Sequence, residues 1–204
     1  MEPAFSRVGV VLAGGASSRF SGEKALAVLQ HRLFYERVLD AVTPHVDRVI
    51  VVSKPTLQME LSNQRDAIMI EDQPPFSGKG PIAGIYSAMK QVPAEWYVVI
   101  AVDMPLMDQK AVGKLIECVN DSFDAIVPVV NERMQPLAAI YHADCLATLH
   151  QQLLNKQYRM IDFLDSVKTK YLTEEELAIP TEAFQNINDD SSYKQLLKEI
   201  EGDR

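Results

Sequence analysis

The stretch Val8-Gly9-Val10-Val11-Leu12-Ala13-Gly14-Gly15 decides the fold. Its first five residues are apolar and rich in valine, which is typical of a short strand buried in a sheet. Ala13-Gly14-Gly15 then ends the strand in a turn, and a polar loop runs on to Lys24. In open α/β sheets, ligands bind outside the carboxyl ends of the strands. The loop after Leu12 is therefore the first place where we expect a binding site.

Further apolar runs alternate with segments of helical spacing. The expected strands are Arg48–Val52, Ala67–Ile70, Trp96–Val102, Ala125–Val130, Leu137–Tyr141 and, as an edge strand, Val167–Leu172. The expected helices are Phe34–Val42, Leu57–Asn63, Ile82–Lys90, Asp108–Asn120, Ala143–Leu154, Met160–Leu164 and Ser191–Ile200. Strands that alternate with helices and lack clean polar alternation are buried on both faces. We therefore predict an α/β fold with three layers, α/β/α, around a mostly parallel twisted sheet, in a single domain over residues 1–204.

Composition and charge exclude several functional classes. The 204 residues are 47% hydrophobic and 24% charged, and the net charge is −8. A face that follows a nucleic-acid backbone is basic, so we expect no nucleic-acid partner. No apolar run reaches the ~18 residues that span a bilayer, so we expect no membrane partner. Two unclustered cysteines, Cys118 and Cys145, fit a reducing compartment, and we expect a cytoplasmic protein.

The loop after Leu12 carries the groups that a triphosphate requires. Gly14 and Gly15 lack Cβ, so backbone N–H groups there can approach an anion. Arg19 and Lys24 add two positive charges within the same loop. Two common fingerprints are missing. There is no G-x-G-x-x-G of dinucleotide-binding proteins, and no P-loop, because a glutamate rather than a glycine precedes the lysine.

Asp103 ends the most apolar predicted strand, Trp96–Val102. A carboxylate at the mouth of a buried parallel strand points toward the ligand crevice. Mg²⁺ is usually held by one or two carboxylates together with substrate phosphates and waters, so one aspartate is sufficient on the protein side. The alternative is that Asp103 caps the following helix, but Asp108 is better placed for that cap. Asp103 is therefore a candidate Mg²⁺ ligand.

These residues resemble the signature of a known family. L-A-G-G-x-S-x-R, then a glycine and a lysine, is similar to the motif of the small nucleotidyltransferases with a Rossmann-like fold, of the nucleotide-diphospho-sugar transferase type. That family also has a strand followed by Asp-Met-Pro, as at Asp103. The resemblance implies that Arg19, Lys24 and Asp103 are catalytic and that Asp103 binds Mg²⁺. One departure is that Phe20-Ser21-Gly22 places the glycine one position later than the family's Met-Gly.

Further matches favour one branch of these enzymes, the molybdenum cofactor guanylyltransferases. They occur in the family's order over nearly the whole chain, at Glu71-Asp72, Gly80–Gly84, Pro136–Tyr141, Arg159–Leu164 and Phe184–Asn188. The resemblance implies GTP and molybdopterin, or the molybdenum cofactor, as substrates. It also implies a guanine dinucleotide as product. Cofactor-delivery proteins and molybdoenzymes are the candidate protein partners.

The expected site has a nucleotide side and an acceptor side. The candidate nucleotide-binding residues are Leu12, Ala13, Gly14, Gly15, Lys24, Asp72, Gly80, Pro81 and Asp103. Asp72 accepts hydrogen bonds either from a guanine or from ribose, and the sequence leaves both open. The candidate acceptor-binding residues are Asn186, Asn188 and Arg159, with Arg133 and Lys79 as further cations. Asn186 and Asn188 share one face of an extended segment.

The expected reaction is in-line attack of the acceptor phosphate on the α-phosphorus of GTP, with pyrophosphate leaving. Several alternatives remain. CTP replaces GTP with the same pterin, or the acceptor is a sugar or polyol phosphate. In a different class, the protein is a non-catalytic GTP-binding regulator. A dehydrogenase is disfavoured by the missing G-x-G-x-x-G.

Overall fold

The computed structural model describes residues 4–14, 20–61 and 67–202. The strands are β1 (Phe5–Leu12), β2 (Val28–Leu29), β3 (Arg32–Leu33), β4 (Arg48–Val52), β5 (Ile68–Ile70), β6 (Ala94–Ala101), β7 (Ala125–Val130), β8 (Arg133–Met134), β9 (Ala138–His142) and β10 (Thr169–Leu172). The α-helices are α1 (Phe34–Val42), α2 (Pro55–Leu61), α3 (Pro81–Gln91), α4 (Gln109–Glu117), α5 (Cys145–Leu154), α6 (Met160–Leu164), α7 (Glu174–Leu177) and α8 (Asp190–Gly202). Short 3-10 helices are η1 (Lys24–Leu26), η2 (Thr43–His45) and η3 (Thr181–Phe184).

The main sheet has the strand order β10-β7-β9-β6-β1-β4-β5, with β8 beside β7. The pairs β1–β4, β1–β6, β4–β5 and β7–β10 are parallel, and β9 runs antiparallel to both of its neighbours. The chain reverses direction between β7 and β8, in a tight turn at Asn131 and Glu132, which both have positive φ. A connection this short can only reverse the chain, because a parallel pairing needs a long crossover. The prediction of a mostly parallel sheet is confirmed.

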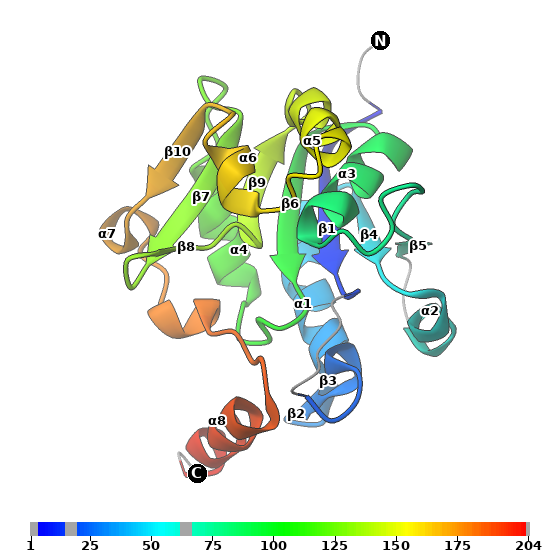
Figure 1. Ribbon diagram of the computed structural model, residues 1–204. Helices are drawn as coiled ribbons and strands as arrows, with labels where there is room; N and C mark the ends of the chain where they lie inside the picture. Colours follow the sequence, from blue (N-terminus) through cyan, green and yellow to red (C-terminus); the bar gives the residue numbers. More distant parts are fainter. Residues whose placement is uncertain (1–3, 15–19, 62–66, 203–204) are drawn as a thin grey trace.

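Helices cover both faces of the sheet, as Figure 1 shows. On one face, α1, α4 and Leu196 of α8 pack against Val11 and the alternate residues of β6 that begin at Trp96. On the other face, α3, α5 and α6 pack against Val8 and Val10. Burial of alternate strand residues on opposite faces explains the lack of polar alternation in the sequence. The three-layer prediction is confirmed.

Several predicted bounds differ from the observed ones. The helix expected at Leu57–Asn63 begins at Pro55, a favourable first position, and residues 62 and 63 lie outside the described part of the chain. The β2–β3 hairpin, β8 and α7 were not predicted, because elements of two to four residues carry almost no periodicity. No helix within the described residues has the length and apolar character needed to cross a membrane.

Gly9, in the middle of β1, allows α1 to pack closely on the sheet. A Cβ at this position would lie 2.4 Å from Cγ1 of Val42 and 3.3 Å from Cγ2 of Val46. Val42 is itself fully buried, so its side chain has no free space to move into. The glycine is thus required by a close approach of helix and strand.

We therefore expect Gly9→Ala to lower the free energy of unfolding by about 1–3 kcal/mol, through overpacking of the core. Urea denaturation checks this value. The double variant Gly9→Ala/Val42→Ala removes the atom that the new methyl group meets, so its loss should be smaller than the sum of the two single losses. A strictly additive double variant would contradict the explanation.

Candidate active site

Four neighbouring parallel strands, β6, β1, β4 and β5, end at one edge of the sheet. The residues just beyond them continue the hydrogen bonding from strand to strand. The N–H groups of Ala13, Ser53 and Val102 donate to the last carbonyl of the adjacent strand, at 2.9, 3.0 and 3.0 Å. The first residue of the loops after β1, β4 and β6 is therefore held by the same kind of hydrogen bond as the strands. This edge is the position at which α/β sheets bind ligands.

A cavity of about 490 Å³ opens at this edge. Its lining includes Leu12, Ala13 and Gly14 after β1, Ser53 and Lys54 after β4, Glu71 and Asp72 after β5, Val102 and Asp103 after β6, Gly80 and Pro81 at the start of α3, and Lys24 from η1. Every predicted nucleotide-binding residue within the described chain lines this cavity. The predicted Gly15 and Arg19 lie outside the described residues.

Lys24 and Asp103 meet inside this cavity. Nζ of Lys24 lies 3.3 Å from Oδ2 of Asp103, and the two side chains are 15% and 20% exposed. The same ammonium group donates to Oδ1 of Asn188 at 2.6 Å. An ammonium group has three N–H donors, so one remains for an anion in the cavity.

The second oxygen of Asp103 is the clearest candidate ligand for a divalent cation. Oδ1 is buried and has no hydrogen-bond partner among the described residues. A buried polar atom without a partner costs about 1–3 kcal/mol, and more when it carries charge. A hard cation such as Mg²⁺ prefers oxygen ligands of this kind. Asp103 is therefore the residue whose surroundings best fit a metal.

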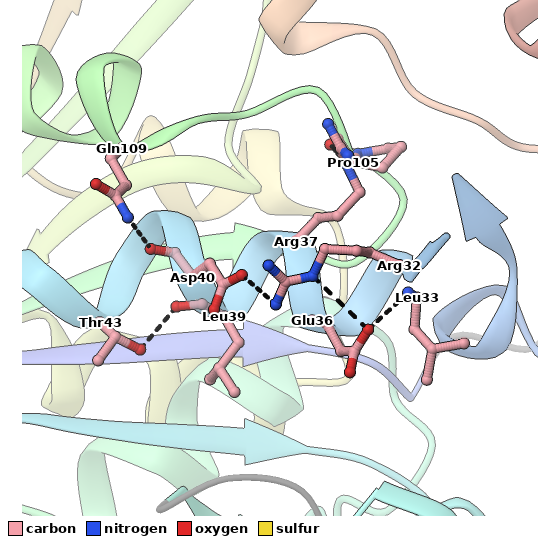
Figure 2. A network of polar contacts seen from close by, with 9 residues as sticks. All are labelled: Arg32, Leu33, Glu36, Arg37, Leu39, Asp40, Thr43, Pro105 and Gln109. Atoms are coloured by element: carbon pink, nitrogen blue, oxygen red, sulfur yellow. Dashed lines mark hydrogen bonds and ion pairs between the residues drawn. The ribbon is translucent and has the colours of Figure 1, made fainter. Parts of the chain in front are cut away.

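Contacts from distant parts of the chain fix the backbone around Asp103. The N–H of Ile187 donates to the carbonyl of Asp103 at 2.8 Å. On α1, Nε of Arg37 donates to the carbonyl of Pro105 at 2.8 Å (Figure 2). Burial lowers the pKa of the Arg37 guanidinium, and nearby Arg32 lowers it further, although an arginine keeps its charge in proteins.

The α1 end of this network is also held in place. Arg32 pairs with Asp40 at 2.6 Å, and the Asp40 carbonyl accepts from Gln109 at the start of α4 (Figure 2). Asp108 accepts from the Ala111 N–H at 2.8 Å and thus caps α4. The cap role belongs to Asp108, which leaves the Asp103 carboxylate for the cavity.

Asp72 holds the loop that forms another wall of the cavity. Its Oδ2 accepts from the N–H of Gly78 at 2.9 Å, and its carbonyl accepts from Ser77. Phe76 anchors the loop against the rings of Tyr86 and His150. Burial raises the pKa of the Asp72 carboxyl, and the hydrogen bond from Gly78 offsets part of that increase. Asp72 is thus a structural support of the loop as well as a candidate ligand.

A second cavity, of about 560 Å³, lies beside the first. Asn188 lines both cavities, and the second is also lined by Arg133, Gln135 and Asn186. The structure therefore places two of the residues predicted to bind the acceptor, Asn186 and Asn188, in the lining of the second cavity, beside the first. It does not bring Arg159 there. Arg159 directly precedes α6 and lines neither cavity. Its side chain is 75% exposed, and its Nη1 lies 3.9 Å from Oδ1 of Asp162.

Comparison with known proteins shows which family the chain belongs to. The model of the MobA-like NTP transferase domain matches residues 9–169. The chain belongs to this family. Proteins described as probable molybdenum cofactor guanylyltransferases, from Halalkalibacterium halodurans and Bacillus velezensis, are each 36% identical to it. The alignments cover 89% and 96% of this chain, and 93% and 96% of those relatives.

A solved structure of the family has the same fold. It is the molybdopterin-guanine dinucleotide biosynthesis protein A from Archaeoglobus fulgidus, which is 27% identical to this chain with a TM-score of 0.81. The superposition covers 97% of this chain and 100% of that one. The expectation of a nucleotidyltransferase fold and family is confirmed.

Two residues of this family member were missed by the sequence analysis. Ser53 lines the first cavity, and its buried hydroxyl has no partner among the described residues. Lys54 also lines the cavity and pairs with Glu23 at 3.5 Å. Both come directly after the predicted strand Arg48–Val52, so the rule that selected Asp103 would have selected them as well.

The raised pKa of Asp72 leads to a prediction about stability. When folding raises a carboxyl pKa, the folded state binds more protons, so stability falls as pH rises from the unfolded pKa through the folded one. Asp72→Asn keeps an oxygen acceptor for the Gly78 N–H. Its amide does not ionise, so the variant does not lose stability in this way as pH rises. We expect the stability of the variant relative to wild type to increase from about pH 4 toward neutrality.

Urea denaturation at several pH values measures this difference. Asp121→Asn, in an exposed loop, removes one negative charge without touching the cavity and serves as the control. A relative stability of Asp72→Asn that is constant over the range, or that falls with pH, would show that burial of the Asp72 carboxylate carries no free-energy cost.

Proposed function

We propose that this protein transfers GMP from GTP to the phosphate of molybdopterin, releasing pyrophosphate and forming the guanine dinucleotide of the cofactor. The observation that supports this best is the position of Lys24. Its ammonium group contacts Asp103 on the nucleotide side and Asn188, which lines both cavities. Lys24 lines the first cavity and contacts the residue that this cavity shares with the second, which suits a transfer between two bound substrates. The descriptions of the relatives support GTP and molybdopterin as those substrates.

In this proposal, the first cavity binds GTP. The turn at Gly14 and the remaining N–H of Lys24 face the triphosphate. The base lies toward Gly80 and Pro81, where a backbone without a bulky side chain permits close approach. Oδ2 of Asp72 is engaged by Gly78, so Oδ1 is the oxygen left for the nucleotide.

The second cavity binds the acceptor. Asn186 and Asn188 offer amide groups, and Arg133 offers the positive charge that a phosphate needs. Arg133 replaces Arg159 in this role, because Arg159 lies outside both linings. The shared residue Asn188 then places the acceptor phosphate close to Lys24.

The chemistry asks mainly for alignment and charge stabilisation. An oxygen of the acceptor phosphate forms a bond to the α-phosphorus, and the bond from that phosphorus to the bridging oxygen of the β-phosphate breaks. The electron pair leaves with pyrophosphate. No general base is needed, because the acceptor phosphate is already an anion. Lys24 stabilises the added charge, and Arg19 remains the predicted second cation.

Magnesium dependence is part of the proposal. The partnerless Oδ1 of Asp103 fits a cation, whereas no group of three or more ligating side chains occurs in the described chain. Bound Mg²⁺ supplies charge neutralisation on phosphate oxygens. We also propose a cytoplasmic location, with cofactor-delivery proteins and molybdoenzymes as partners.

Asp103→Ala tests the site. We expect pyrophosphate release to fall about 100-fold or more, as when a group that stabilises the transition state is removed. Asp108→Ala is the matched control. It removes the cap of α4, so it should cost about 1 kcal/mol of stability and leave turnover near wild type. Near-wild-type turnover of Asp103→Ala would rule out this assignment.

Pyrophosphate release with GTP and with CTP, each with molybdopterin and Mg²⁺, tests the substrates. We expect at least a roughly 10-fold preference for GTP in kcat/KM, because hydrogen-bonding sites strongly reject a base that leaves their groups unpaired. A preference for CTP would favour the cytidylyltransferase alternative. GTP binding without turnover on molybdopterin or on sugar and polyol phosphates would favour a regulator.

A further inference from the structure

The segment that leads into α8 returns to the loop that carries Lys24. Ile187 contacts the Asp103 backbone, and Asn188 contacts Lys24. Tyr193, in the first turns of α8, packs against the rings of Phe20 and Phe34, at 5.6 and 5.7 Å between ring centres. Figure 1 shows α8 at the end of the chain, on the side of the molecule where β2 and β3 lie. The Tyr193 hydroxyl donates to the Val28 carbonyl in that hairpin at 2.6 Å.

Asp190 makes the most specific of these contacts. Its Oδ1 accepts from the Ser21 N–H at 2.9 Å, and its Oδ2 accepts from the Ser21 hydroxyl. Two hydrogen bonds to one residue fix both the position and the orientation of that residue. Both hydrogen bonds favour the charged carboxylate and lower the Asp190 pKa, so this clasp, Ser21–Asp190, is intact at neutral pH.

The clasp lies at the start of the short segment that ends at Lys24. Gly22 has φ of +107°, and apart from its two neighbours no described residue has an atom within 4 Å of where a Cβ would be, so among the described residues no packing at Gly22 fixes the chain between Ser21 and Lys24. Beyond Lys24, the chain is fixed by Ala25, which is 1% exposed. At the other end of the segment, Phe20 packs on Tyr193 of α8, and the clasp fixes Ser21 itself through its backbone N–H and its hydroxyl. It also lies where Phe20-Ser21-Gly22 departs from the usual family motif.

We propose that Asp190 is a positioning residue, which holds Ser21 so that Lys24 is kept in contact with Asp103 and Asn188 in the first cavity. The inference rests on the proposed function above. The clasp links the C-terminal segment, which carries Asn186 and Asn188 of the acceptor cavity, to the loop that serves the nucleotide. A displacement of a catalytic group by about 1 Å costs up to about 100-fold in rate, so even a weak surface clasp matters if it sets the place of Lys24.

The alternative is that Asp190 only helps α8 to pack. Leu196 is 2% exposed, and Tyr193 packs on Phe20 and Phe34, so α8 stays anchored without the clasp and its loss should leave the fold intact. The two roles predict different effects of Asp190→Ala when Lys24 is also replaced. A positioning residue acts through Lys24 and has no effect once Lys24 is gone, whereas a purely structural residue has the same effect in either background.

The test measures kcat for pyrophosphate release with GTP and molybdopterin in four proteins: wild type, Asp190→Ala, Lys24→Ala and the double variant. We expect Asp190→Ala to lower kcat roughly 10-fold in the wild-type background, and by less than about 2-fold in the Lys24→Ala background. Glu199→Ala is the matched control, because Glu199 is an exposed carboxylate on the same helix and accepts a hydrogen bond from Gln195 rather than from Ser21. It should change neither rate.

Amide hydrogen exchange provides a readout that does not need turnover. In Asp190→Ala, but not in Glu199→Ala, exchange of the peptide that spans Phe20–Leu29 should be faster. Unchanged exchange would overturn the clasp. Faster exchange with an unchanged kcat, or equal losses in both Lys24 backgrounds, would overturn the positioning role.

Failure of the proposed function gives a different result. In that case wild-type protein releases no pyrophosphate, and the same four proteins are compared by their Kd for a fluorescent GTP analogue. A loss of affinity in Asp190→Ala that disappears in the Lys24→Ala background supports the inference, and an equal loss in both backgrounds overturns it.

Discussion

The site depends on one constraint, which is that four adjacent parallel strands end at the same edge of the sheet. The loops that come after β1, β4, β5 and β6 therefore lie side by side. Hydrogen bonds from Ala13, Ser53 and Val102 to the neighbouring strands then fix the first residue of the loops after β1, β4 and β6. Residues that are far apart in the sequence, such as Gly14, Asp72 and Asp103, become the wall of one cavity because the strands before them pair.

This constraint explains why part of the site could be predicted from the sequence. A buried strand can be recognised from its run of apolar residues, and the residue after it must lie at the ligand edge if the sheet is parallel. Asp103, Asp72 and Gly14 were found in this way together with the family motif. The same logic applied to Arg48–Val52 leads to Ser53 and Lys54, which were overlooked because neither belongs to a familiar motif.

Features that depend on contacts between distant segments could not be predicted. The pairing of Lys24 with Asn188 and the pairing of Ser21 with Asp190 join residues 164 and 169 positions apart. No local pattern encodes such a pairing, because an exposed aspartate at the start of a helix reads equally well as a stabiliser of that helix. The exclusion of Arg159 has the same origin. Arg159 belongs to a segment that resembles the family, but that resemblance does not tell whether the start of α6 lies at a cavity.

Charge provides the last link between the structure and the proposed reaction. Among the described residues, the first cavity is lined by four carboxylates (Glu23, Glu71, Asp72 and Asp103) and by two lysines (Lys24 and Lys54). Each lysine pairs with one of those carboxylates, so this part of the lining has a net negative charge, as the whole chain does. A bare triphosphate is repelled by such a surface. In the proposed reaction, a triphosphate that arrives with a divalent cation would not be repelled, because the cation would offset its charge and Oδ1 of Asp103, which has no partner among the described residues, would hold it.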